Sequence, residues 1–315
     1  MTPVSPNAQT AESLVEPMNT IAADTAIPFA TATVRDYVQL SKLRMGFLAA
    51  LISATGYYMG AGAQVNLWGM LHAFIGTWII STGAFALNMY LERDLDGLME
   101  RTRLRPLPAG RMQPRQALAF GMIIAAAGVA YLAVLCNLVS AAVGAIALGS
   151  YVAIYTPMKR VSNLNTIVGA FPGALPPVIG WAAVRGDIGF GAGLMFAILF
   201  LWQLPHFLAI AWMYKEDYQS AGMPMITTLD ASGQFTARQM VIYGAAYAFM
   251  TLLPFNAHMT GPAYLWTALV SGLFVFALCV RWAIVRDRPA AVHIFLSSLF
   301  HLPLLYVMMV LDKIG

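Results

Sequence analysis

Nine long apolar stretches constrain the fold of this chain more than any other feature of its sequence. An α-helix needs about 20 apolar residues to cross the hydrocarbon core of a bilayer. The stretches have this length, and glycine and proline recur inside them, which membrane helices tolerate. We therefore predict an all-α membrane protein, a bundle of about nine transmembrane helices. The stretches cover residues 45–63, 67–91, 116–136, 138–156, 164–184, 190–213, 239–258, 262–282 and 290–311.

The distribution of charge predicts an orientation for this bundle. Only 10% of the 315 residues are charged, against about 25% in soluble domains. Of the 18 Lys and Arg residues, only Arg185 and Lys313 fall on the side opposite the N-terminus. Because cytoplasmic loops carry the excess of Lys and Arg, we predict a cytoplasmic N-terminus and an outside C-terminus. This bias also accounts for the net charge of +4 without a nucleic-acid partner.

The composition of the N-terminal segment predicts where the transmembrane domain begins and which membrane holds it. Residues 1–34 contain no Lys or Arg but do contain Glu12, Glu16 and Asp24. A mitochondrial presequence is Arg-rich and acid-poor, and a secretory signal has a basic start. We predict a disordered cytoplasmic tail over residues 1–36, a single transmembrane domain over residues 37–315, and a location in a bacterial inner membrane.

Acidic residues close the second apolar stretch. On a helix with 3.6 residues per turn, Asn88, Glu92 and Asp96 form one ladder, whereas Asp94 points elsewhere. Carboxylates at a membrane edge need a compensating partner. Oxygen ligands suit Mg²⁺, which commonly binds through a few carboxylates together with substrate phosphates. The ladder predicts a Mg²⁺ site and a phosphorylated substrate, and the alternative is that the acids only pair with nearby arginines.

A basic, proline-rich loop follows the ladder and carries a family resemblance. It contains Met99, Arg101-Thr102 and the segment from Arg105 to Gly110. Together with the ladder, this pattern resembles the signature of UbiA-type intramembrane prenyltransferases, nine-helix proteins that bind a prenyl diphosphate through Mg²⁺. The resemblance implies that the acids serve a metal and a diphosphate.

A second polar segment closes the sixth apolar stretch and departs from the usual UbiA pattern. Most enzymes of this type carry a second Asp-xxx-Asp pair here, and alignment on Gly222 puts Tyr214 and Tyr218 at those positions. Glu216 and Asp217 could supply carboxylates to a second Mg²⁺, and the choice between them is open. Its motifs Pro205-His206-Phe207, Asp217-Tyr218 and Ala221-Gly222-Met223-Pro224 resemble the branch of the family that farnesylates protoheme IX.

The resemblance implies a specific reaction. The enzyme would transfer the farnesyl group of farnesyl diphosphate to the vinyl group of heme b, giving heme O and diphosphate through an allylic cation. Heme O would then pass to a heme A synthase. One alternative is a UbiA-type enzyme acting on a quinone precursor or chlorophyllide, which predicts Asp at positions 214 and 218. Another is a transporter, whose site would lie at mid-membrane on broken helices.

The resemblance also assigns roles to individual residues at the cytoplasmic face of the lipid bilayer. Asn88, Glu92, Asp96 and Asp217 would be catalytic, with Glu216 as a further metal ligand. His206 would serve in heme docking or proton handling, although a membrane histidine can also be a hydrogen-bond partner within the bundle. The residues expected to bind the diphosphate are Lys42, Arg44, Arg101, Arg105, Lys159, Arg160 and Lys215.

Overall fold

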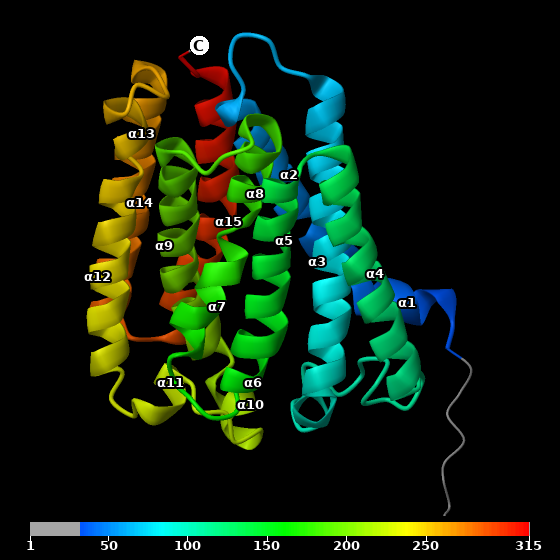
Figure 1. Ribbon diagram of the computed structural model, residues 1–315. Helices are drawn as coiled ribbons and strands as arrows, with labels where there is room; N and C mark the ends of the chain where they lie inside the picture. The colour runs from blue at the N-terminus through cyan, green and yellow to red at the C-terminus, as the bar shows by residue number, and fades with distance from the viewer. Residues whose placement is uncertain (1–31, 315) are drawn as a thin grey trace, which may run out of the picture.

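The computed structural model describes residues 32–314, and within them every regular element is a helix (Figure 1). This confirms the predicted all-α class. The elements are α1 (Val34–Ser41), α2 (Leu43–Gly60), α3 (Leu67–Asp96), α4 (Pro114–Leu135), α5 (Leu138–Gly149), η1 (Ser150–Tyr155), α6 (Thr156–Met158), α7 (Asn165–Gly173), α8 (Pro176–Arg185), α9 (Phe190–Met213), α10 (Lys215–Ser220), α11 (Ile226–Leu229), α12 (Gln234–Met250), α13 (Leu253–Asn256), α14 (Pro262–Val285) and α15 (Arg288–Leu311).

Each predicted apolar stretch coincides with a helical rod, and three of the rods are interrupted. The π-helix η1 joins α5 to α6, a short break separates α7 from α8, and α13 follows α12. Among residues 32–314, seven rods have the length and apolar composition to cross a membrane: α3, α4, α5 to α6, α7 to α8, α9, α14 and α15. The helices α2 and α12 pack beside them but are not among the seven, so the count of nine spans stays a prediction.

The start of the chain differs from the predicted domain boundary. The helix α1 begins at Val34, whereas the predicted tail extends to residue 36. Thr33 caps this helix, and its backbone nitrogen and hydroxyl both donate to the Asp36 carboxylate. This reciprocal cap gives α1 a defined start. Residues 1–31, which make up most of the predicted tail, lie outside the described residues.

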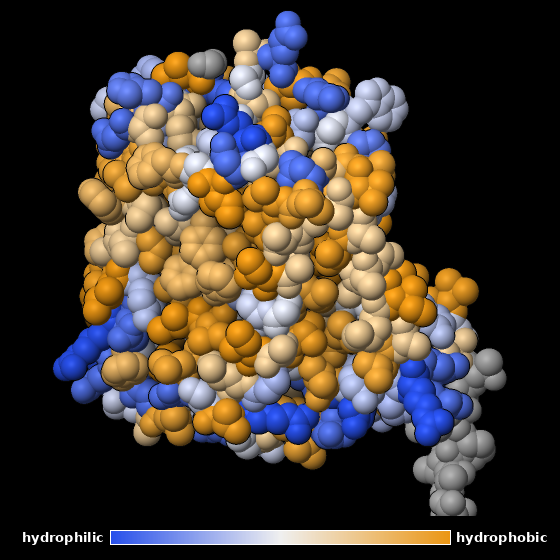
Figure 2. All heavy atoms as spheres, viewed as in Figure 1, coloured by the Kyte–Doolittle hydropathy of each residue, from blue (hydrophilic) through white to orange (hydrophobic). Residues whose placement is uncertain are grey.

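The outer surface of the bundle matches a bilayer. In Figure 2, apolar side chains cover the middle of the visible face, and polar side chains gather at its two ends. The loop after α3 and the short helices α6, α10 and α11 lie together at the lower end of the bundle in Figure 1. The two polar segments of the sequence therefore meet at one end.

Glycines allow the closest helix contacts. On α8, a Cβ at Gly180 would overlap the Ser53 carbonyl and lie 2.7 Å from the Tyr57 backbone nitrogen. On α2, a Cβ at Gly56 would overlap the Pro177 carbonyl. Small residues let membrane helices approach in this way, and the close packing stabilises the pair.

We expect Gly180→Ala to separate α2 from α8 and to lower the stability of the detergent-solubilised protein by about 1–3 kcal/mol, the usual cost of overpacking. Thermal unfolding measures the effect. Gly193→Ala on α9 is the matched control, because a Cβ at Gly193 meets no atom within 4 Å. Equal unfolding temperatures for the two variants would contradict this view of the α2–α8 contact.

Candidate active site

The acidic ladder occupies the last turns of α3 and faces the interior of the bundle. Asn88 and Asp96 are each 1% exposed and Glu92 is 7% exposed. Asp94 is exposed and lies 3.7 Å from Arg93, in agreement with the predicted split of the acids by helical phase. Asp94 is thus separated from the ladder.

Asn88 is oriented by the rod that contains the π-helix. Its side-chain nitrogen donates to the Thr156 hydroxyl at 3.1 Å, and that hydroxyl donates to the Tyr151 carbonyl at 2.8 Å. The amide oxygen of Asn88 therefore remains available as a ligand. The π-helix η1 ends directly before Thr156, and such local widening recurs at functional sites. The sequence patterns assigned no role to Thr156, which meets Asn88 only through the packing of α3 against this rod.

Glu92 pairs with a lysine from the same rod. Its Oε1 lies 2.6 Å from Lys159 Nζ, and this amine also lies 4.5 Å from the centre of the Tyr155 ring. The ion pair compensates the charge of the buried carboxylate.

Asp96 is held by the loop that follows it. Arg105 Nη1 donates to both carboxylate oxygens at 2.7 Å. The Thr102 hydroxyl donates to the Asp96 carbonyl at 2.8 Å and fixes the start of the loop. Arg105 is thus placed against the ladder by a turn that begins at its own acidic partner.

Lys42 approaches the same cluster from the junction of α1 and α2. Its backbone is left-handed, with φ of 44°, and its Nζ lies 5.4 Å from the centre of the Phe85 ring. Burial, together with the nearby charges of Arg105 and Lys159, lowers the pKa of Lys42 to about 7. A lysine with this pKa is poised to take up a proton when an anion binds.

The junction itself is anchored by an ion pair that the sequence analysis did not predict. Arg111 Nε donates to Asp36 at 2.8 Å and links α1 to the loop after α3. Hydrogen bonds from Arg111 and from Thr33 lower the pKa of Asp36 to about 2. Because the partners are 75 residues apart, no local pattern in the sequence reveals them.

The ladder supplies two carboxylates and one amide oxygen toward a divalent cation. Within residues 32–314 no group of three or more His, Cys, Asp or Glu side chains is arranged for a metal. Two carboxylates and one amide oxygen nevertheless fit Mg²⁺, which usually takes its remaining ligands from water and phosphate oxygens. The burial of Glu92 and Asp96 on the same face of α3 as Asn88 is the clearest sign of such a site.

The second polar segment joins the first through Arg101. Its guanidinium carbon lies 4.7 Å from the ring centre of Tyr214 and 5.9 Å from that of Tyr218. Glu216 is exposed and Asp217 is half-buried, and neither forms an ion pair among the described residues. Their roles as metal ligands therefore stay predictions.

Three of the predicted diphosphate ligands lie away from the ladder. Arg160 donates to the Leu91 carbonyl at 2.8 Å and lies 3.9 Å from Asp94. Arg44 is exposed beside Trp78 on the outer side of α2. Lys215 lies 4.9 Å from the Trp212 ring centre and donates to the Asp230 carbonyl, after α11, at 3.1 Å. Their contact with a diphosphate stays a prediction.

His206 lies inside α9, 7% exposed, and packs against α15. Its ring stacks between Trp202 and Phe295, with centroid distances of 4.7 and 5.1 Å. Its Nδ1 lies 2.7 Å from the Ser298 hydroxyl, which itself donates to the Phe295 carbonyl. Because that hydroxyl proton is used, Ser298 accepts from Nδ1, and Nε2 of the neutral ring carries the free lone pair.

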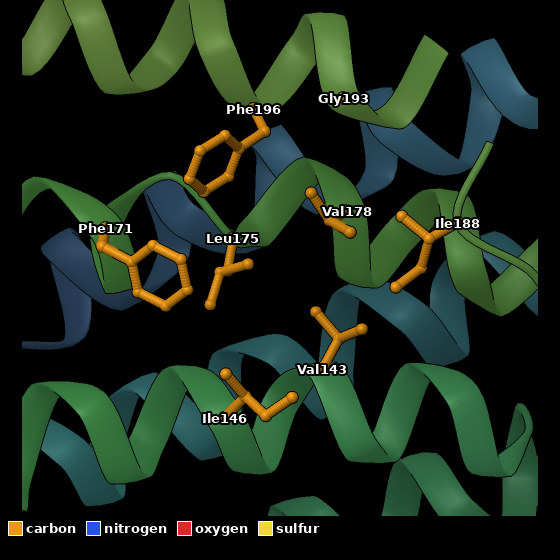
Figure 3. Close-up of a pocket in the computed structure, with 8 residues that line it drawn as sticks. All are labelled: Val143, Ile146, Phe171, Leu175, Val178, Ile188, Gly193 and Phe196. Carbon is orange, nitrogen blue, oxygen red and sulfur yellow. The ribbon is translucent and has the colours of Figure 1, made fainter. Parts of the chain in front are cut away.

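An apolar cavity of about 220 Å³ lies between α5, α7, α8 and α9 (Figure 3). All the side chains drawn there are hydrocarbon, so the cavity suits an apolar chain and not a polar group. The lining residues are Val143, Ile146, Phe171, Leu175, Val178, Ile188, Gly193 and Phe196.

Comparison with known sequences places the chain in a family. Residues 49–299 match the model of the UbiA prenyltransferase family. A protoheme IX farnesyltransferase from Solibacter usitatus is 44% identical over 291 residues, covering 90% of this chain and 100% of that protein. Another from Koribacter versatilis is 37% identical over 296 residues, covering 91% of this chain and 96% of its own length.

Solved structures support the same fold. The structure reported for digeranylgeranylglyceryl phosphate synthase in membranes aligns with this chain at a TM-score of 0.73 and 13% identity. The alignment covers 88% of this chain and 97% of that one. A UbiA homolog from Archaeoglobus fulgidus, bound to DMAPP and Mg²⁺, aligns with a TM-score of 0.59 at 13% identity, over 87% of this chain and 99% of its own. The chain is therefore a prenyltransferase and belongs to the UbiA prenyltransferase family.

Proposed function

We propose that this protein transfers the farnesyl group of farnesyl diphosphate to the vinyl group of protoheme IX, giving heme O and diphosphate. The observation that carries the proposal is the buried ladder of Asn88, Glu92 and Asp96, surrounded by basic side chains from three other segments. The names of the relatives at 37–44% identity favour heme over a quinone precursor or chlorophyllide. Membership of an enzyme family argues against the transporter.

The charges of the site suit a diphosphate. Lys42, Arg105 and Lys159 lie beside two carboxylates, and Arg101 lies on the same loop as Arg105, so the cluster holds a surplus of positive charge. Basic side chains of this kind stabilise the charge that develops on a departing diphosphate. Mg²⁺, bound through Asn88, Glu92 and Asp96, supplies Lewis-acid neutralisation of the same charge. Asp217 or Glu216 could add a carboxylate from the opposite segment.

The reaction divides into steps that the basic side chains and the apolar bundle favour. The C–O bond of farnesyl diphosphate breaks with its electron pair leaving on the diphosphate, beside the basic side chains. The terminal vinyl carbon of heme b then bonds to the allylic carbon, and water adds to the cation left next to the porphyrin ring, with loss of a proton. The apolar bundle keeps bulk water from the allylic cation before the C–C bond forms. Tyr151 and Tyr155 present aromatic faces beside the ladder.

The charge bias supports an orientation for the protein in its membrane. We place it in a bacterial inner membrane with the site toward the cytoplasm, because Lys and Arg concentrate at the end where the site lies. Heme O would leave toward an enzyme that oxidises it further to heme A.

The Asp96→Asn variant tests the proposed reaction. The purified wild type, given heme b, farnesyl diphosphate and Mg²⁺, should yield heme O, identified by mass spectrometry. Asp96→Asn removes a charge that holds Arg105 and the metal, so turnover should fall about 10²–10³-fold, the usual cost of losing an electrostatic group. Glu100→Gln is the control, because Glu100 is exposed and pairs with Arg103. Full activity in Asp96→Asn would refute the role of the ladder.

The pKa of Lys42 predicts a pH dependence of diphosphate binding. The protonated amine attracts the anion, and the pKa of about 7 means that this proton is lost as pH rises from 6 to 9. Affinity for inorganic pyrophosphate, measured by calorimetry, should therefore fall by up to about tenfold per pH unit above 7. Lys42→Met should bind more weakly at pH 6 and show a flatter profile. Profiles of equal slope would exclude Lys42 from the diphosphate site.

The free Nε2 of His206 predicts a role in heme docking. Heme b titrated into the detergent-solubilised protein should bind with a shifted Soret band, and His206→Ala should weaken this binding. Ser298→Ala should weaken it about 10-fold, as expected when the partner that orients an iron ligand is lost. His301→Ala is the control, because both its ring nitrogens are already bonded, to Tyr247 and Ser271. Equal heme affinity in wild type and His206→Ala would contradict this role.

A further inference from the structure

Arg101 is fixed between the two polar segments by aromatic rings. Its guanidinium carbon lies 4.7 Å from the ring centre of Tyr214 and 5.9 Å from that of Tyr218. Its Nη2 also donates to the Tyr218 hydroxyl at 3.4 Å. These contacts join residues 117 positions apart. They hold a flexible side chain in one place.

The charge of Arg101 is not neutralised within the described residues. Arg105 pairs with Asp96, and Lys159 pairs with Glu92. Among residues 32–314, Arg101 forms no ion pair with a carboxylate. Stacking on an aromatic ring uses the face of a guanidinium and leaves its N–H groups at the edge free. Arg101 therefore offers free donors and an unpaired positive charge, the combination that binds phosphate oxygens.

Tyr218 is packed against the loop of the acidic ladder. Tyr218 contacts the apolar cluster that includes Met99 and Met223, with Leu95 at its edge. The Ser220 hydroxyl donates to the Leu98 carbonyl at 3.4 Å. Leu95 directly precedes Asp96 in the chain. The contacts of α10 with Leu95 and Leu98 therefore fix its position relative to the ladder.

A second contact joins the loop of Arg101 to the ladder. Arg101 directly precedes Thr102, whose hydroxyl donates to the Asp96 carbonyl at 2.8 Å. Asp96 pairs with Arg105, and Glu92, one turn earlier on α3, pairs with Lys159. Arg101 and its two tyrosines thus stand at the rim of the same site and not on a separate surface.

We propose that Tyr214 and Tyr218 are positioning residues that hold Arg101 as a fixed cation for the diphosphate. This inference rests on the proposed function, because it requires that the site bind a diphosphate. The tyrosines act through their ring faces, and the weak hydroxyl contact of Tyr218 is secondary. At this side of the site a stacked guanidinium thus supplies a fixed positive charge.

The experiment compares pairs of substitutions that keep or remove the rings. Binding of inorganic pyrophosphate to the full chain in detergent is measured by calorimetry, with Mg²⁺ and with a chelator. Tyr214→Phe with Tyr218→Phe should retain affinity within about 3-fold, whereas Tyr214→Leu with Tyr218→Leu should lose about 5- to 30-fold, the effect of two cation–π contacts. Arg101→Gln should lose at least as much. Arg103→Gln, an exposed arginine paired with Glu100, should match the wild type.

The outcomes separate this inference from the function on which it rests. If the Leu pair binds like the wild type while Arg101→Gln loses affinity, the tyrosines do not position Arg101. If Arg101→Gln also binds like the wild type, Arg101 is not a diphosphate ligand. If the wild type itself binds no pyrophosphate with Mg²⁺, the proposed function fails as well. Combining Arg101→Gln with the Leu pair should add no further loss, and thermal unfolding checks that the variants are folded.

Discussion

The burial of two carboxylates at the end of a membrane helix is the constraint on which the rest of the site depends. Glu92 and Asp96 are 7% and 1% exposed, and an unpaired charge in such a place is costly. Each is compensated by a cation from another segment, Lys159 at 2.6 Å and Arg105 at 2.7 Å. The ladder therefore forms only when the loop after α3 and the rod containing η1 are both in place.

The same requirement explains several irregular features of the backbone. The π-helix η1 lies directly before the turn that brings Thr156 and Lys159 to the ladder. The left-handed backbone of Lys42 aims a third cation at the cluster, and the Asp36–Arg111 pair holds this junction against the loop. Backbone strain of this kind persists only where surrounding contacts enforce it. These features together produce a site with surplus positive charge next to oxygen ligands that suit a metal ion.

Local periodicity made the helices and the ladder predictable. The apolar stretches have the length of membrane spans, and the 3.6-residue repeat separates Asp94 from Glu92 and Asp96, as the structure confirms. The residue patterns did not predict the partners, because Lys159 and Glu92, or Arg101 and Tyr218, meet only through the packing of distant helices. The family resemblance supplied the basic residues as a group but not their places: Arg44 and Lys215 lie away from the ladder, and Tyr214 and Tyr218 stack on Arg101.

The central claim is that a metal and a diphosphate bind together on the buried face of α3. Calorimetric titration of Mn²⁺ into the protein with pyrophosphate present tests this most directly, with Glu92→Gln compared against Asp94→Asn. Both substitutions remove one negative charge from the same helix, but only Glu92 faces the interior. The account predicts that Glu92→Gln abolishes tight Mn²⁺ binding and that Asp94→Asn leaves it intact. Retained binding in Glu92→Gln, or its loss in Asp94→Asn, would contradict it.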